Sequence, residues 1–309
     1  MRFDLFPGVV WLARNAREWI LATLQVQELI ESGIHFGHPA SRWNPKMAPY
    51  IYGRRHFIHI IDLKETVKGI LRAKKFLTRL VADGQDVIFV GTKRQARAAI
   101  EQEAGRAGMP YVSYRWLGGT LTNFRTVRSR LSRLEELDTI MTSGAIQQYS
   151  KKMISNLQRE HRKLKRNLDG IRTMTRLPGA LLVVDSVREK NAVREANRLG
   201  IPVVALADTE ANPDELAVVI PGNDDAMRAI EIVLKHLADA AVEGMANRAA
   251  RAVVEGEGQV LRRGPSRPRV HGAEPRSGQD ETARPAAEMP LPKPHPAMPV
   301  EGETNPAEG

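Results

Sequence analysis

Residues 115–124, RWLGGTLTNF, combine side chains that suit a phosphate-rich partner. Arg115 can pair with a phosphate through two guanidinium nitrogens, and Trp116 can stack on a base. The glycine pair lets another backbone come close, while Thr122 or Asn123 can cap the helix that follows. The segment therefore predicts phosphate contact. The alternative is a glycine turn with Trp116 in the core, and for Trp116 alone this is the better interpretation.

A second candidate phosphate site lies in VIFVGTKRQARAAI, where an apolar run ends at Gly91. Thr92 is placed to cap a helix whose first turn carries Lys93 and Arg94. A helix N-terminus with free N–H groups and two cations attracts phosphate. The segment matches neither GxGxxG nor GxxxxGK followed by Ser or Thr, so it is weak support for a bound nucleotide. The alternative is an ordinary strand-to-helix turn with solvated cations.

Two histidine pairs, His35 with His38 and His56 with His59, raise the question of a metal site. Helix breakers surround the first pair. The second pair lies in HFIHII, which is interpreted as a strand that would put its two histidines on opposite faces. We expect no carboxylate near these histidines to complete either site. We therefore expect no metal at these histidines.

Catalytic signatures are equally weak. Ser186 follows Asp185 without the GxSxG pattern of a nucleophile elbow. Asp208 stands beside Thr209 and Glu210, but no HExxH or paired-carboxylate signature surrounds it. Asp185 and Asp208 are interpreted as loop caps. The sequence predicts neither an enzyme nor a cofactor.

The charge of the chain is concentrated in one region. The 309 residues carry a formal net charge of +10, and residues 115–176 hold fourteen basic side chains against five acidic ones. A solvated helix face normally mixes both signs, so this surplus predicts RNA binding. The chain has no cysteine, which excludes disulfides and thiolate metal sites and is compatible with a reducing cytosol.

Apolar runs alternate with helical patterns on both sides of the basic region. The runs are HFIHIIDL, DVIFVG, PYVSY, ALLVVD, IPVVALAD and AVVIPG. Short continuous apolar strands separated by amphipathic helices predict a parallel sheet covered on both faces. The expected fold is therefore a three-layer α/β domain made of residues 26–120 and 177–244, with its last helix ending near Glu243.

Residues 121–176 interrupt this repetition and predict an inserted helical hairpin. Apolar residues recur at helical spacing from Val127 to Met141 and again from Ile154 to Ile171, while Gly144 marks the bend. A seam of this coiled-coil kind buries one stripe of each helix and leaves Arg and Lys facing outward. We expect the hairpin to project from the sheet and present its cations.

Both ends differ in composition from the predicted domain. Residues 1–25 form an extension with three arginines and two acids, which indicates no secretory signal. An extra helix or a mis-assigned start is preferred there over an organellar presequence. Residues 245–309 are predicted as a disordered tail rich in Pro, Gly, Glu and Arg. Weak RNA contact by its arginines is the alternative to a solvated tail.

Four stretches together resemble ribosomal protein S2 of the bacterial type: LIESGIHFGHPASRWNPKMAPYIYGRRHFIHIIDL, FVGTKRQAR, RWLGGTLTNFRTVRSRLSRL and LPGALLVVDSVREKNAVREANRLGIPVVALADTEANPDELAVVIPGNDDA. The resemblance covers roughly residues 26–244, with the motifs in matching order. It implies a flavodoxin-like parallel sheet with an inserted coiled-coil hairpin. It also implies a structural constituent of the small ribosomal subunit that supports translation and performs no catalysis.

The partners implied by this resemblance are small-subunit ribosomal RNA and neighbouring small-subunit proteins, including the ribosomal protein S1 that the family helps to dock. The implied location is the ribosome in the cytoplasm, with organellar import left open. The charge pattern and the resemblance together predict these RNA contacts: Arg42, Lys46, Lys93, Arg94, Arg115, Trp116, Arg125, Arg128, Arg162, Lys163, Lys165 and Arg166.

Two other classes of function stay open at this point. A flavodoxin-like enzyme or nucleotide-binding protein would use residues 91–94 and the aspartates at strand ends, and nucleotides or sugar phosphates would then raise its heat stability. A protein-docking scaffold would set the hairpin against another coiled coil. Charge reversals in the hairpin would then weaken association with protein rather than RNA.

Overall fold

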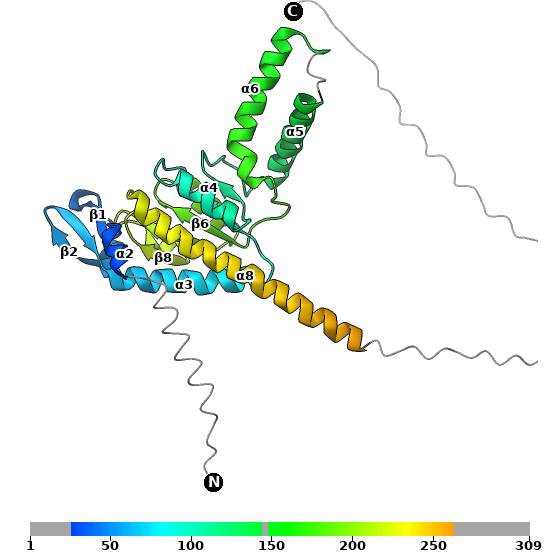
Figure 1. The fold of residues 1–309 in the computed structure, drawn as a ribbon. Coiled ribbons are helices and arrows are strands. Elements are labelled where there is room, and N and C mark those ends of the chain that lie inside the picture. The colour runs from blue at the N-terminus through cyan, green and yellow to red at the C-terminus, as the bar shows by residue number, and fades with distance from the viewer. Residues whose placement is uncertain (1–25, 144–147, 263–309) are drawn as a thin grey trace, which may run out of the picture. The chain divides into compact units, whose positions relative to one another are not determined.

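The computed structural model describes residues 26–143 and 148–262. Its main sheet has five parallel strands in the order β5-β4-β6-β7-β8 (Figure 1). The strands are β4 (Val87–Val90), β5 (Tyr111–Val112), β6 (Ala180–Val184), β7 (Val203–Ala207) and β8 (Val218–Pro221). Numbered among the parallel strands alone, the order is 2-1-3-4-5, which is the flavodoxin-like order. The expected flavodoxin-like sheet is confirmed.

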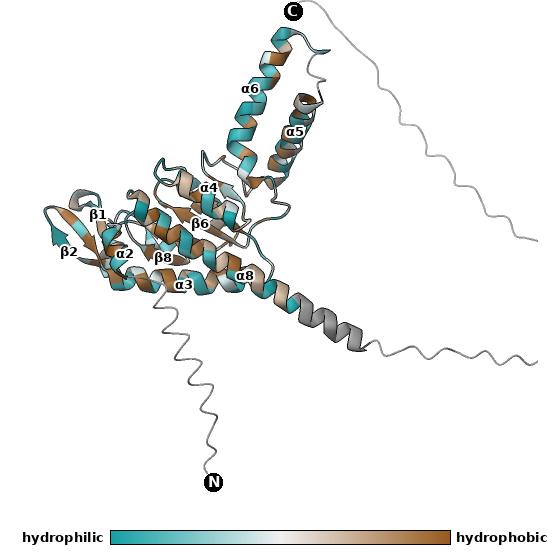
Figure 2. Ribbon diagram, in the orientation of Figure 1, coloured by the Kyte–Doolittle hydropathy of each residue, from teal (hydrophilic) through white to brown (hydrophobic). Residues whose placement is uncertain are grey.

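Helices cover both faces of this sheet and give three layers. One face carries α3 (Leu63–Ala82), α4 (Arg97–Arg106) and α8 (Met227–Arg262); the other carries α7 (Lys190–Arg198) and the root of the hairpin. Phe89 and Leu182 pack into the first core, whereas their neighbours Ile88 and Leu181 pack into the second. Burial on both faces explains why these strands are continuous apolar runs, drawn largely in brown in Figure 2.

A separate antiparallel sheet precedes the main one, and it corrects one expectation. After the short helix α2 (Val26–Glu31) come β1 (Phe36–Pro39), β2 (Ile51–Arg55) and β3 (Ile58–Ile61), which pair in the order β1-β3-β2. The run HFIHIIDL, predicted as a strand of the parallel sheet, supplies β3 of this small sheet instead. The cause is the turn at His56 and Phe57, whose φ angles of 49° and 64° reverse the chain between β2 and β3.

The basic insert folds as two helices, α5 (Phe124–Thr142) and α6 (Lys151–Leu168). The buried residues of the predicted seam are Val127, Leu131, Leu134, Leu137, Leu157, Leu168 and, just after α6, Ile171. Arg133 with Glu160 at 3.4 Å and Asp138 with His161 at 2.6 Å link the two arms. At the root, Val127, Leu131 and Leu168 join the core that α7 shares with the sheet. The predicted bend at Gly144 lies outside the described residues.

Helix α8 is longer than the sequence pattern suggests. It continues beyond Glu243 as far as Arg262, so the expected tail from residue 245 begins with helix instead. The helix continues through Gly244, where the absence of a side chain lets α8 lie close against α3. An added Cβ would come within 2.7 Å of the Val81 Cβ and 2.8 Å of the Thr78 carbonyl oxygen. None of the described helices is both long enough and apolar enough to cross a membrane. Residues 1–25 and 263–309 lie outside the description.

Candidate nucleic-acid interface

A hollow of about 710 Å³ at the root of the hairpin is lined by five cations and, among the described residues, by no acid. Helix α6 supplies Arg159, Arg162, Lys163 and Arg166, whose spacing of i, i+3, i+4 and i+7 puts them on one helix face. Arg115, from the loop after β5, completes the set. We call this group the cationic hollow. Unopposed positive charges in a concave surface attract phosphates.

Tyr114 borders the cationic hollow and holds two guanidinium groups against its ring. The Cζ atom of Arg166 lies 4.4 Å from the ring centroid, and that of Arg97 lies 4.8 Å from it. Such cation–π contacts fix the positions of both cations. The Nε of Arg97 also donates a hydrogen bond to the Thr92 carbonyl oxygen at 3.2 Å. The stack joins the first turn of α4 to the last turn of α6.

A second hollow, of about 330 Å³, shares Tyr114, Arg166 and Asn167 with the first. Lys165 lines it together with Arg97 from α4. Unlike the cationic hollow, it also contains carboxylates, those of Glu101 and Asp169. We call it the mixed hollow. The structure thus places two surfaces of different chemistry side by side at the hairpin root.

The loop 115–124 already holds an anion from its own chain. Both oxygens of the Glu195 carboxylate accept hydrogen bonds here: Oε1 from Trp116 Nε1 at 3.1 Å and Gly119 N at 2.8 Å, and Oε2 from Leu121 N at 3.0 Å. Burial by itself raises the pKa of Glu195, but these hydrogen bonds outweigh it and bring the pKa below its ordinary value. These backbone amides of the loop are therefore occupied by an internal carboxylate.

Trp116 is correspondingly a structural residue in this loop. Its side chain is only 7% exposed and packs in the core shared with α7, which agrees with the alternative interpretation rather than with base stacking. Asn123 precedes α5 at the cap position. Its side-chain oxygen, however, accepts a hydrogen bond from the Thr126 hydroxyl at 2.8 Å and none from a backbone N–H of the helix. Only Arg115 of this loop lines the cationic hollow.

Lys93 differs from the sequence prediction in a similar way. The residue is buried, and its Nζ lies 2.6 Å from Asp224, 2.6 Å from Asp225 and 3.3 Å from Asp185. Burial lowers the pKa of Lys93, but the hydrogen bonds and charges of these aspartates raise it by more than burial lowers it. The ammonium therefore stays charged. Lys93 is therefore neutralised inside the protein by these aspartates. Helix α4 begins only at Arg97, so Lys93 is not in its first turn.

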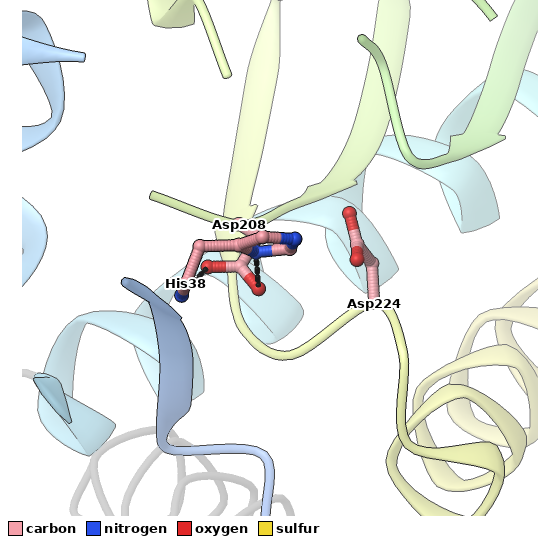
Figure 3. A group of neighbouring side chains, drawn as sticks. All are labelled: His38, Asp208 and Asp224. Carbon is pink, nitrogen blue, oxygen red and sulfur yellow. Dashed lines mark hydrogen bonds and ion pairs between the residues drawn. The ribbon is translucent and has the colours of Figure 1, made fainter. Parts of the chain in front are cut away.

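Carboxylates from distant parts of the sequence surround His38 (Figure 3). His38 Nδ1 lies 2.7 Å from Asp208 Oδ2, and ligand atoms of His38, Asp208 and Asp224 all lie within 4.8 Å of one another. The expectation that no carboxylate stands near the histidines is therefore wrong, because the fold brings the ends of β7 and β8 to β1. His35, His56 and His59 do not belong to this group.

Protonation in this group follows from its crowded charges. The hydrogen bond that the His38 imidazole donates to the Asp208 carboxylate raises the pKa of His38 to about 9, against the opposing effect of burial. Burial, reinforced by the charge of Asp185, raises the pKa of Asp224 to about 7, although Lys93 lowers it. Among the described residues, His38 and Lys93 supply the positive charge that these aspartates face.

Comparison with known proteins identifies the family. Residues 29–244 match the family model for Ribosomal protein S2. The chain belongs to the ribosomal protein S2 family. Small ribosomal subunit protein uS2 of Rhodopirellula baltica is 58% identical over 219 residues, which cover 71% of this chain and 84% of that protein. The protein of the same name from Syntrophobacter fumaroxidans is 53% identical over 224 residues, covering 72% of this chain and 82% of its own length.

Membership of the S2 family assigns the chain to the small ribosomal subunit as a structural constituent, and the family is not enzymatic. RNA binding is typical of the family, in agreement with the cationic hollow. The flavodoxin-like enzyme considered from the sequence is therefore set aside. Residues 91–94, the segment that would have bound phosphate in such an enzyme, instead contribute Lys93 to an internal cluster of ion pairs.

The structure brings some of the predicted RNA contacts together and separates others. Arg115, Arg162, Lys163 and Arg166 meet in the cationic hollow, and Lys165 lines the mixed hollow beside it. The other members of the predicted set that are exposed, and that do not line the cationic hollow, are Arg42, Lys46, Arg94, Arg125 and Arg128.

Two of these outlying cations already have partners in the protein. Lys46 forms an ion pair with Asp214, and Arg128 donates to the Met174 carbonyl oxygen at 3.2 Å. Sequence reasoning missed Arg97, Tyr114 and Arg159. Only Arg159 had a usable signal, because it shares the helical spacing of Arg162 and Arg166.

Proposed function

We propose that this chain binds small-subunit ribosomal RNA through the cationic hollow and the exposed basic face of α6. The observation that supports the proposal most is the lining of five cations with no acid among the described residues. Two other cations, by contrast, are neutralised within the fold: Lys93 pairs with Asp224, and Arg106 pairs with Glu103 and Asp239. Within the described part of the chain, no salt bridge involves any cation of the hollow.

The proposed mechanism is electrostatic anchoring on a rigid platform. Cations of the hollow neutralise RNA phosphates and release condensed counterions, which favours binding strongly at low salt. The root of the hairpin is packed into the core of the sheet, so these cations are presented without ordering a mobile segment. Contacts to phosphates position an RNA segment and carry no sequence information by themselves.

Salt dependence tests this mechanism. The affinity of the full chain for small-subunit ribosomal RNA should fall steeply as salt rises. Changing Arg162→Gln should reduce the slope of log affinity against log salt by about one, since one phosphate contact is lost. Arg72→Gln, at an exposed position of α3 on the other face of the sheet, is the matched control and should leave the slope unchanged. A slope that is flat in the unaltered chain would contradict the proposal.

We further propose that the chain helps to dock ribosomal protein S1 on the small subunit in the cytoplasm. The support is the family resemblance, together with large apolar side chains on the small sheet: Tyr52 is 80% exposed and Phe57 is 78% exposed. Exposed aromatic residues of this kind mark protein-binding surfaces. Replacing both by alanine should lower the amount of S1 on isolated subunits without lowering the amount of this chain. Unchanged S1 occupancy would remove this surface from the docking proposal.

A further inference from the structure

The mixed hollow has a lining unsuited to phosphate. Its carboxylates, Glu101 and Asp169, would repel an RNA backbone that the neighbouring cationic hollow attracts. Each carboxylate has one contact of its own: Glu101 accepts from the Ser113 hydroxyl at 2.6 Å, and Asp169 lies 3.5 Å from Arg172 Nε. A carboxylate accepts about four hydrogen bonds, so both retain acceptor capacity.

The same hollow offers cations and an aromatic ring. Arg97, Lys165 and Arg166 line it, and Tyr114 lies against both arginines. Donors, acceptors and a flat ring in one hollow match a nucleobase, which presents both kinds of polar group on a flat body. The volume of about 330 Å³ lies in the range of small-ligand pockets.

Asn167 supplies an independent sign of a missing ligand group. It lines both hollows, and its buried side-chain oxygen has no hydrogen-bond donor within the described part of the chain. Buried acceptors normally have a donor. A phosphate diester has no N–H or O–H to give, whereas a nucleobase edge does. The oxygen is covered in the unbound chain, so a ligand reaches it only after the Asn167 side chain rotates; a base can then supply the donor that a phosphate lacks.

We propose that the mixed hollow binds one unpaired nucleobase of RNA, a guanine in a bulge or loop, while the cationic hollow holds the phosphates beside it. Guanine presents acceptors, O6 and N7, that suit the cations, and N–H donors that suit the carboxylates of Glu101 and Asp169. The inference rests on the proposed RNA-binding function and adds to it the kind of RNA segment recognised.

The test compares three short RNA hairpins against the full chain. One is a perfect duplex, the second carries a single bulged guanosine, and the third carries an abasic nucleotide in the bulge. The guanosine bulge should bind about tenfold more tightly than the other two, which is the value of one well-held base. The abasic bulge separates the contribution of the base from that of a more flexible backbone.

Two variants assign the effect to its hollow. Glu101→Gln with Asp169→Asn keeps the size of both exposed side chains and should abolish the preference for guanosine. Arg162→Glu with Lys163→Glu should weaken all three RNAs alike. Equal binding of the three RNAs by the unaltered chain, or a preference that survives in the first variant, would overturn the inference and leave RNA binding intact. Failure to bind any of the three would count against the proposed function itself.

Discussion

The Glu195 carboxylate accepts from the backbone N–H groups of Gly119 and Leu121, so residues 115–124 are held by the protein's own anion. Residue types alone predicted phosphate contact by this segment. They could not reveal Glu195, which lies more than seventy positions away in the sequence. The same limit applies to Lys93, because its aspartate partners come from other strand ends.

Loss of the Glu195 carboxylate should destabilise the fold. Glu195→Ala leaves several N–H donors and the Trp116 Nε1 without an acceptor, and we expect the free energy of unfolding to fall by ~1–3 kcal/mol. Denaturant unfolding measures this change. Glu135→Ala, at an exposed position of α5, is the control and should change stability little. Equal stability of the two variants would show that the loop does not depend on Glu195.

The His38–Asp208 pair should make stability depend on pH. The pKa of His38 is about 9 in the folded protein and about 6.5 when unfolded, so its contribution is complete below pH 6.5 and lost as pH rises to 9. The free energy of unfolding should fall by up to ~3 kcal/mol across this window. Asp224, with a pKa of about 7, titrates in the lower part of this pH window. Between about pH 7.5 and 9, the change in stability therefore reports mainly on His38. Asp208→Asn should flatten the curve there; an unaltered curve would exclude the pair as its cause.

At the scale of elements, periodicity predicted the parallel strands and the two-helix insert, since both bury apolar residues in regular patterns. It failed where backbone conformation decided the outcome. His56 and Phe57 adopt positive φ angles without the glycine or asparagine that normally signals such a turn. The pattern predicted a helix end near Gly244, but this glycine lies within α8 and allows its close packing against α3. Local sequence does not distinguish these roles.

The packing of α3 against α8 should be sensitive at Gly244. Gly244→Ala places a Cβ within 2.7 Å of Val81 and 2.8 Å of the Thr78 carbonyl oxygen, and should cost ~1–3 kcal/mol. Gly105→Ala in α4 is the matched control, because nothing lies within 4 Å of its added Cβ. It should be neutral or stabilising by up to ~1 kcal/mol. Thermal unfolding compares the two; an unchanged melting temperature for Gly244→Ala would mean that α8 shifts freely.

On the scale of the whole molecule, the fold treats two groups of cations differently. Lys93, Arg106 and Arg133 pair with acids, whereas Arg159, Arg162 and Lys163 line the cationic hollow with no salt bridge in the described part of the chain. The charge surplus of the insert was visible in the sequence, and so were its outward-facing residues. Their meeting with Arg115, Tyr114 and Arg97 was not, because only the topology of the sheet brings α4, the loop after β5 and α6 together.

The central claim is that the cationic hollow anchors the chain on the small ribosomal subunit. The most direct measurement is sedimentation of tagged variants in cell lysates, with fractions probed for this chain. Arg159→Glu, Arg162→Glu and Lys163→Glu together reverse the charge of the hollow, while Lys64→Glu, Lys68→Glu and Arg72→Glu together reverse an exposed face of α3. The α3 variant should migrate with small subunits, whereas the hollow variant should remain free and keep an unchanged melting temperature when purified. Normal migration of the hollow variant with small subunits would contradict it.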